Sequence, residues 1–200
     1  MKKIILIITL LILNIYLFFI RDQEVALEKI DLNLQYNELG IVFLGLDKSD
    51  SLILSINDIN ILYIIDLKDF EPLKKEINRL NLNIDFVVMN ENYDVDLNIP
   101  KKIVKESLSL NSITFNNGSY QSINYNNQSL CINNTNCDYV YYTKSSVRVN
   151  DNKVLFFNQD IKLPDNLYKE WVDIYKISNS IYTILKVSDT YKVIEIIKNI

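Results

Sequence analysis

The sequence contains no histidine among its 200 residues, and it contains only two cysteines, three glycines and three prolines. Without histidine there is no imidazole to act as a general base, to activate a serine or cysteine nucleophile, or to ligate zinc. Two cysteines are too few for a four-thiolate metal site. These absences favour a non-catalytic role, although they leave open whether the chain is an enzyme.

The overall composition is that of a folded protein. Hydrophobic residues make up 48% of the chain and charged residues 23%, which is close to the average of globular domains. A chain of this length forms one domain or at most two small ones.

The N-terminus predicts a membrane anchor over residues 1–21. Ile4 to Ile20 is a run without charge, and 14 of its 17 residues are Ile, Leu or Phe. As a helix this run is about 26 Å long, slightly short of a hydrocarbon core of ~30 Å. Lys2 and Lys3 precede it, so the positive-inside rule places the N-terminus in the cytoplasm and the rest of the chain outside.

A cleaved signal peptide is the alternative for this segment. Its apolar region is usually about 7–15 residues long and ends in a small-residue cleavage site. Here the run is longer and no Ala-x-Ala-like site follows it. We therefore favour a single-pass membrane protein with its C-terminal domain outside the cytoplasm.

The rest of the chain is acidic, and residues 22–39 read as a charged linker before a domain over residues 40–200. Without Lys2, Lys3 and Arg21, 18 basic residues stand against 25 acidic ones, a net charge of −7. Nucleic-acid-binding surfaces are usually basic, so nucleic acid is not the expected partner. The expected partners are the membrane, through the N-terminal helix, and another protein of the cell envelope.

Cys131 and Cys137 are separated by five residues. In an oxidising space outside the cytoplasm this spacing allows a disulfide that closes a small loop. Two unpaired thiols are the alternative.

Local patterns predict alternating strands and helices. Asp69 can cap a helix over residues 70–80, in which Leu73, Ile77 and Leu80 share one face. Strands are expected over 41–44, 51–56, 60–65, 84–89, 181–187 and 191–197, a polar loop over 90–98, helices over 100–108 and 165–176, and hairpins at Asn117-Gly118 and over 147–157. This order indicates an α/β fold with sheets between helices.

Several short segments of the sequence resemble segments of a known protein family and occur in the same order as in that family. Phe43-Leu44 and Asp50-Ser51 stand where that family has Phe-Leu-Asp-Val-Gly-Gln-Gly-Asp-Ser, and Tyr63-Ile-Ile-Asp66 matches a strand ending in Leu-Ile-Asp. Ile84-Asp85 opens a strand that resembles Ile-Asp-x-Leu-Ile-Leu-Thr-His. The chain thus resembles the C-terminal metallo-β-lactamase-like domain of ComEC-type competence DNA-uptake proteins. The resemblance implies a shortened αββα sandwich.

The resemblance also shows what has been lost. The family's metal motif, His-x-His-x-Asp-His, falls on Asn90-Glu-Asn-Tyr-Asp94-Val95, where only Asp94 can act as a ligand. Amide and valine side chains cannot replace the imidazoles that hold two hydroxide-generating metals. The resemblance therefore implies a degenerate domain without a metal cofactor, serving as a binding or scaffold module.

Two other functions remain open. Carboxylates can hold Mg²⁺, so Asp47, Asp50, Asp66 and Asp94 would have to lie together in a nuclease or phosphodiesterase. We expect instead that these acids lie in solvated loops and that Asp50-Ser51 supports a turn. The third possibility is an unrelated anchored α+β domain that binds an envelope partner. The candidate binding positions are Asp47, Asp50, Ser51, Asp66, Asn90 and Asp94.

Overall fold

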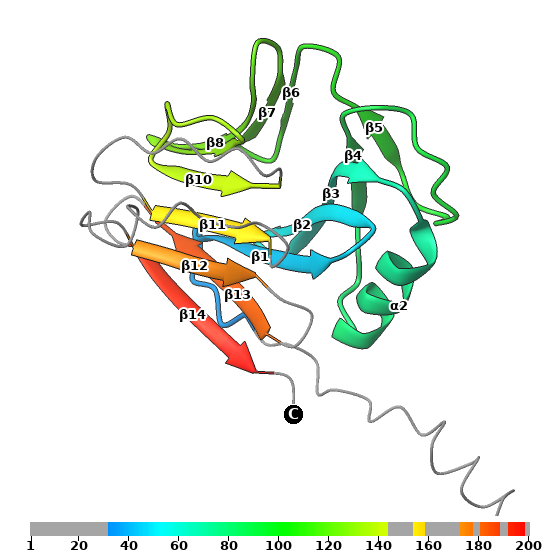
Figure 1. Ribbon diagram of the computed structural model, residues 1–200, viewed down its shortest axis with the longest axis horizontal. Coiled ribbons are helices and arrows are strands. Elements are labelled where there is room, and N and C mark those ends of the chain that lie inside the picture. Colours follow the sequence, from blue (N-terminus) through cyan, green and yellow to red (C-terminus); the bar gives the residue numbers. More distant parts are fainter. Residues whose placement is uncertain (1–31, 144–153, 159–172, 178–180, 189–191, 199–200) are drawn as a thin grey trace, which may run out of the picture.

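The computed structural model describes residues 32–143, 154–158, 173–177, 181–188 and 192–198, and these form two stacked seven-stranded sheets (Figure 1). The described part is mostly β, with a single helix, rather than the α/β arrangement predicted from the sequence. The stacked sheets agree with the two central layers of the expected sandwich.

The first sheet is mixed and has the strand order β14-β13-β1-β2-β3-β4-β5. Neighbours from β14 to β3 are antiparallel, whereas β4 and β5 add in parallel. The turn between β2 and β3 uses Asn57 and Asp58, both at positive φ, as a two-residue hairpin turn requires. The strands are β1 (Leu39–Leu46), β2 (Ser49–Ile56), β3 (Ile59–Leu67), β4 (Phe86–Met89), β5 (Lys101–Ile103), β13 (Ile181–Val187) and β14 (Lys192–Lys198).

The second sheet has the order β12-β11-β10-β9-β8-β7-β6. It is antiparallel from β6 to β9 and parallel from β9 to β12. The expected hairpin at Asn117-Gly118 is present as β7 and β8. The strands are β6 (Ser107–Leu110), β7 (Ile113–Asn117), β8 (Gln121–Tyr125), β9 (Gln128–Ile132), β10 (Tyr139–Tyr142), β11 (Val154–Asn158) and β12 (Asp173–Ile177).

Strand β1 is buried on both faces, because successive side chains point to opposite sides of a sheet. Ile41 and Phe43 face the second sheet, and Val42 and Leu44 face the other way. The Phe43 ring stacks on Phe156 with centroids 4.2 Å apart, so aromatic packing joins the two layers.

Helix α2 (Phe70–Leu80) covers the other face of the first sheet (Figure 1). Asp69 caps it by accepting a hydrogen bond from the backbone N of Glu71, as the sequence predicts. Leu73, Ile77 and Leu80 are its buried side chains.

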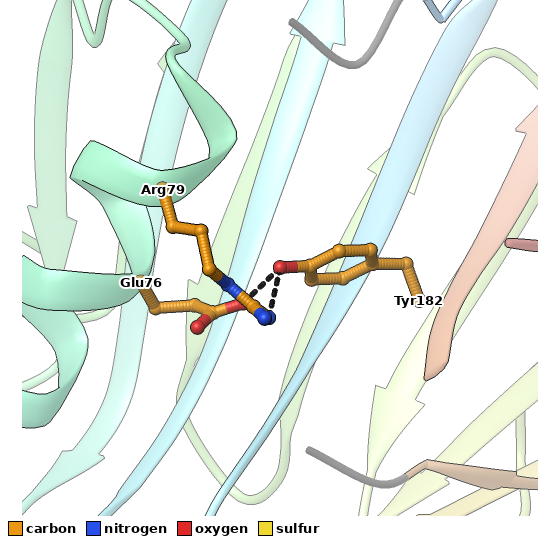
Figure 2. Close-up of polar contacts among 3 residues, drawn as sticks. All are labelled: Glu76, Arg79 and Tyr182. Carbon is orange, nitrogen blue, oxygen red and sulfur yellow. Dashed lines mark hydrogen bonds and ion pairs between the residues drawn. The ribbon is translucent and has the colours of Figure 1, made fainter. Parts of the chain in front are cut away.

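A polar cluster fastens the same helix to strand β13. Figure 2 shows Glu76 and Arg79 of α2 meeting the Tyr182 hydroxyl. The hydroxyl donates to Glu76 Oε1 and accepts from Arg79, which also forms an ion pair with Glu76. Burial and the nearby Glu76 carboxylate raise the pKa of Tyr182, so its hydroxyl stays protonated. The cluster links segments about one hundred residues apart in the chain and is structural.

Three local predictions differ from the structure. Residues 100–108 are not a helix: β5 and the start of β6 occupy them, because each pairs with a neighbouring strand. The end of the predicted helix over 165–176 is strand β12, which pairs with β11, while residues 165–172 lie outside the described residues. Strand β11 pairs in parallel with β10 and β12, and residues 147–153 of its predicted hairpin are also outside.

The proposed anchor over residues 1–21 lies outside the described residues. Within the described part, no helix has the length and apolarity needed to cross a membrane. Of the predicted linker, residues 32–39 are described, and they already pack with the domain: Leu32 is buried in the cluster under α2, and Leu39 opens β1.

Candidate functional site

Asn90 is the predicted site residue at which the sequence resemblance would place the start of a metal motif. It follows strand β4 directly, and its backbone N–H donates to the carbonyl of Ile64 at 3.4 Å. Only 6% of the residue is exposed to solvent. A buried amide needs hydrogen-bond partners, so the surrounding contacts show what this position does.

A tyrosine–asparagine network surrounds Asn90 and joins the two sheets. The Tyr63 hydroxyl, from β3, donates to Asn90 Oδ1 at 2.7 Å. The Asn117 amide, from the end of β7, donates to the backbone carbonyls of Asn90 at 3.3 Å and Val104 at 3.0 Å. The Tyr63 ring also packs on Phe115 of the second sheet, with centroids 5.0 Å apart. The network therefore fills the space between the sheets at this end.

The Tyr63 hydroxyl is a permanent donor at neutral pH. Burial raises the pKa of Tyr63 to about 12, because desolvation disfavours the phenolate. The carbonyl oxygen of Asn90 is thus already engaged. Within the described part, Asn90 Nδ2 and the hydroxyl of the fully buried Tyr141 have no hydrogen-bond partner. Two buried polar groups without partners are a stability cost at this end of the sandwich.

A second tyrosine, Tyr93, lies on the loop after β4. Its hydroxyl donates to the backbone carbonyl of Ile65 at 3.2 Å. Its pKa is raised to about 12, first by partial burial and then by the negative charges of Glu91, Asp66 and Asp50. Burial and the charge of Asp50 also raise the pKa of Tyr141. Asp50 is therefore near enough to act electrostatically on both phenols.

The predicted site residues fall into three different environments. Asp47 is exposed in the turn between β1 and β2, and Asp94 is exposed in the loop after β4. Asp50 and Asp66 are half-buried cross-strand partners, and the ladder shifts register at a bulge between Asp50 and Ser51.

The pair Asp50-Ser51 therefore lies inside strand β2 and does not support a turn, contrary to the sequence prediction. Ser51 is buried, and its hydroxyl is hydrogen-bonded to that of Ser49. The actual turn is Asp47-Lys48, just before the strand.

The donors at this end do not fit a metal centre of the family's type. Such a centre needs imidazoles, and the whole chain has none. Among the described residues, no group of three or more Asp, Glu or Cys side chains is placed to hold an ion. The four aspartates required by the carboxylate alternative are all described, and the fold does not gather them into such a group.

Cys131 and Cys137 are joined as a disulfide. Their Cα atoms are 5.5 Å apart, within the usual range for disulfides. The bridge closes the connection between β9 and β10, two parallel neighbours in the second sheet. It stiffens this turn and lies outside the tyrosine–asparagine network.

The sequence singled out Asn90 but gave no indication that Tyr63, Asn117 or Tyr141 would lie near it. Each of these residues lies in a segment expected to form strands, and the residues on either side of it are typical of an ordinary strand. Their convergence depends on how the two sheets stack. No local signal in the sequence marks it.

Among the comparisons with known proteins, only the comparison with solved structures gives matches, one of which is a metallo-β-lactamase fold protein. No protein-family model matches the chain, and no curated protein is significantly similar to it. Among solved structures, the chain is similar to the metallo-β-lactamase fold protein YhfI from Bacillus subtilis, with 10% sequence identity and a TM-score of 0.46. The match covers 74% of this chain and 100% of that one. At this level of similarity no residue role and no activity carries over.

Proposed function

We propose that this chain is a membrane-anchored, extracytoplasmic binding or scaffold module, built on a metallo-β-lactamase-like sandwich that does not perform metal-dependent hydrolysis. The observation that carries the proposal is the state of Asn90. This residue stands at the position of the family's first metal ligand, and its side-chain oxygen is taken by the Tyr63 hydroxyl.

The contacts around Asn90 support a structural use of this position. Tyr63 and Asn117 reach it from different sheets and are held by their own strands. Hydrogen bonds that are buried and shared between layers stabilise a packed interface. A metal site needs ligands whose lone pairs face an open position.

The charge of the domain supports a protein partner in the cell envelope rather than DNA. The net charge of residues 22–200 is −7, and phosphate backbones bind basic surfaces. In an assembly of the competence type, this chain would dock to another protein of the cell envelope. The Lys101 ammonium group donates a hydrogen bond to the Val95 carbonyl, so this positive charge is engaged within the domain.

Metal content and hydrolysis test the proposal directly. The full chain, purified in detergent, would be analysed for zinc, manganese, iron and magnesium, and assayed against bis(p-nitrophenyl) phosphate with each ion added. We expect substoichiometric metal and no turnover above that of an Asn90→Ala variant. Stoichiometric metal together with chelator-sensitive turnover would overturn the non-catalytic assignment.

The anchor is tested separately, because it is independent of the site. We expect the full chain to stay in the membrane fraction after extraction with alkaline carbonate. A reporter enzyme that is active only outside the cytoplasm, fused after Ile200, should be active. Release into the soluble fraction, or an inactive outside reporter combined with an active cytoplasmic one, would contradict the anchored topology.

A further inference from the structure

A groove with a volume of about 600 Å³ lies at the opposite end of β2 and β3 from Asn90. This volume falls in the range of roughly 300–1,000 Å³ that is usual for small-molecule sites. Its walls are the segment before β1, the turn between β2 and β3, and the segment before β4. None of its residues belongs to the tyrosine–asparagine network.

Hydrogen bonds within the fold hold the walls of this groove in place. Asn57 Oδ1 accepts from the backbone N–H of Asn37 at 2.9 Å, and Asn60 Nδ2 donates to the carbonyl of Asn83 at 2.8 Å. A Cβ added at Gly40 would lie 3.0 Å from both Cδ atoms of Leu34, so this glycine lets the first wall approach β1 closely. The groove is therefore formed before any ligand arrives.

The rim carries polar groups that the fold does not use. Within the described part of the chain, the side chains of Gln35, Asp58 and Asn83 form no hydrogen bond or ion pair. Tyr36 stands beside them with 85% of its surface exposed. Two amides, one carboxylate and one aromatic ring thus border the same opening.

Three leucines add apolar surface to the polar lining, which narrows the class of ligand. Leu32 is buried, while Leu34 and Leu82 are half-buried, and all three line the groove. A carboxylate at the rim of an acidic domain repels anions. The groove instead suits a neutral molecule. Its hydroxyl groups would donate to the carboxylate, an amide group would pair with the amide side chains, and a methyl group would pack against the leucines.

We propose that this groove binds a neutral oligosaccharide that contains N-acetylhexosamine. The sugar ring lies against the Tyr36 face, its hydroxyls donate to the Asp58 carboxylate, and its acetamido group bonds Gln35 and Asn83. The acetyl methyl group packs against the leucine side chains of the lining. The site is separate from the position tested under the proposed function, so either can fail without the other.

The test is calorimetric titration of the full chain with chitotriose, in a zwitterionic detergent that has no sugar head group. Maltotriose, which has no acetamido group, is the comparison ligand. We expect chitotriose to bind with a dissociation constant on the order of 1 mM or below, and maltotriose to bind more weakly.

Two variants locate the site. Tyr36→Ala and Asp58→Asn should each weaken chitotriose binding roughly tenfold. The first variant removes the ring that contacts the sugar, and the second removes a charge-assisted hydrogen bond. Both should fold: Tyr36 is exposed, and Asp58 has a φ of 64°, which asparagine tolerates. Tyr36→Phe, which keeps the ring, should retain binding. Tyr120→Ala removes an exposed tyrosine elsewhere and should change nothing.

Three results would overturn the proposal. The first is the absence of saturable chitotriose binding by the unaltered chain. The second is equal binding by Tyr36→Ala, Asp58→Asn and the unaltered chain, which would place the sugar elsewhere. The third is equal affinity for maltotriose, which would refute recognition of the acetamido group.

Discussion

Replacing Tyr63 by phenylalanine should reveal how much the buried Tyr63–Asn90 hydrogen bond contributes to the stability of the domain. The change keeps the ring on Phe115 but removes the hydroxyl that donates to Asn90 Oδ1 at 2.7 Å. That oxygen then remains buried without a partner, beside an Nδ2 that already has none. Leaving one buried acceptor unsatisfied costs about 1–3 kcal/mol, so we expect the free energy of unfolding to fall by this amount.

A double-mutant cycle separates this cost from simple loss of packing. Asn90→Leu alone leaves the Tyr63 hydroxyl without its acceptor and should destabilise the domain to a similar degree. In the double variant both partners are apolar and the unpartnered Nδ2 is gone, so its loss should be smaller than the sum of the single losses by about 1 kcal/mol or more.

The assay is urea-induced unfolding of the full chain in detergent, followed by β-sheet circular dichroism, with Tyr120→Phe as the matched control for losing an exposed hydroxyl. A Tyr63→Phe loss no greater than that of the control would refute the reasoning. Additive losses in the double variant would show that the two side chains do not act as a pair.

Three further predictions use the same unfolding assay. Burial raises the pKa of Tyr63 from 10.0 to about 12, so the folded state holds this proton more tightly than the unfolded state does. This group should therefore not affect stability below pH 10, and the free energy of unfolding should fall by up to roughly 2 kcal/mol between pH 10 and pH 12. The fall should be smaller in Tyr63→Phe. Equal slopes in both proteins would contradict this assignment. Replacing both Cys131 and Cys137 by serine should cost about 2 kcal/mol, the chain-entropy value for so short a loop, and an unchanged urea midpoint would argue against the disulfide. Phe43→Ala should cost about 3–5 kcal/mol, because it empties the contact between the sheets, whereas a loss below that of Tyr63→Phe would mean that the sheets do not depend on this ring.

The parts of the fold that local patterns predict well are those whose signals are complete within a few residues. The helix over 70–80 was expected with its Asp69 cap and its buried face, and all three are observed. The strands 181–187 and 191–197 correspond to β13 and β14, joined as an antiparallel pair. In each case the periodic pattern lies within the element, and the turn residues that end it are directly beside it in the sequence.

The errors occur where pairing with a distant strand decides the structure. Pro100 comes directly before residues 101–103, which suits a helix start, yet these residues form the edge strand beside β4. Asp173–Ile177 pairs in parallel with β11 and is therefore a strand. Backbone hydrogen bonds to a neighbouring strand outweigh the small intrinsic preference for helix at both places.

For the candidate site, the absence of histidine is a matter of composition alone, and no arrangement of the chain can supply the missing imidazoles. The strand over 84–89 and the place of Asn90 directly after it could likewise be read from the residues. The tertiary structure, in contrast, decided which side chains reach Asn90. Tyr63 reaches its side-chain oxygen because β3 pairs with β4 in the same sheet. Asn117, 54 residues further along the chain, reaches the backbone carbonyl of Asn90 only because the second sheet packs on the first.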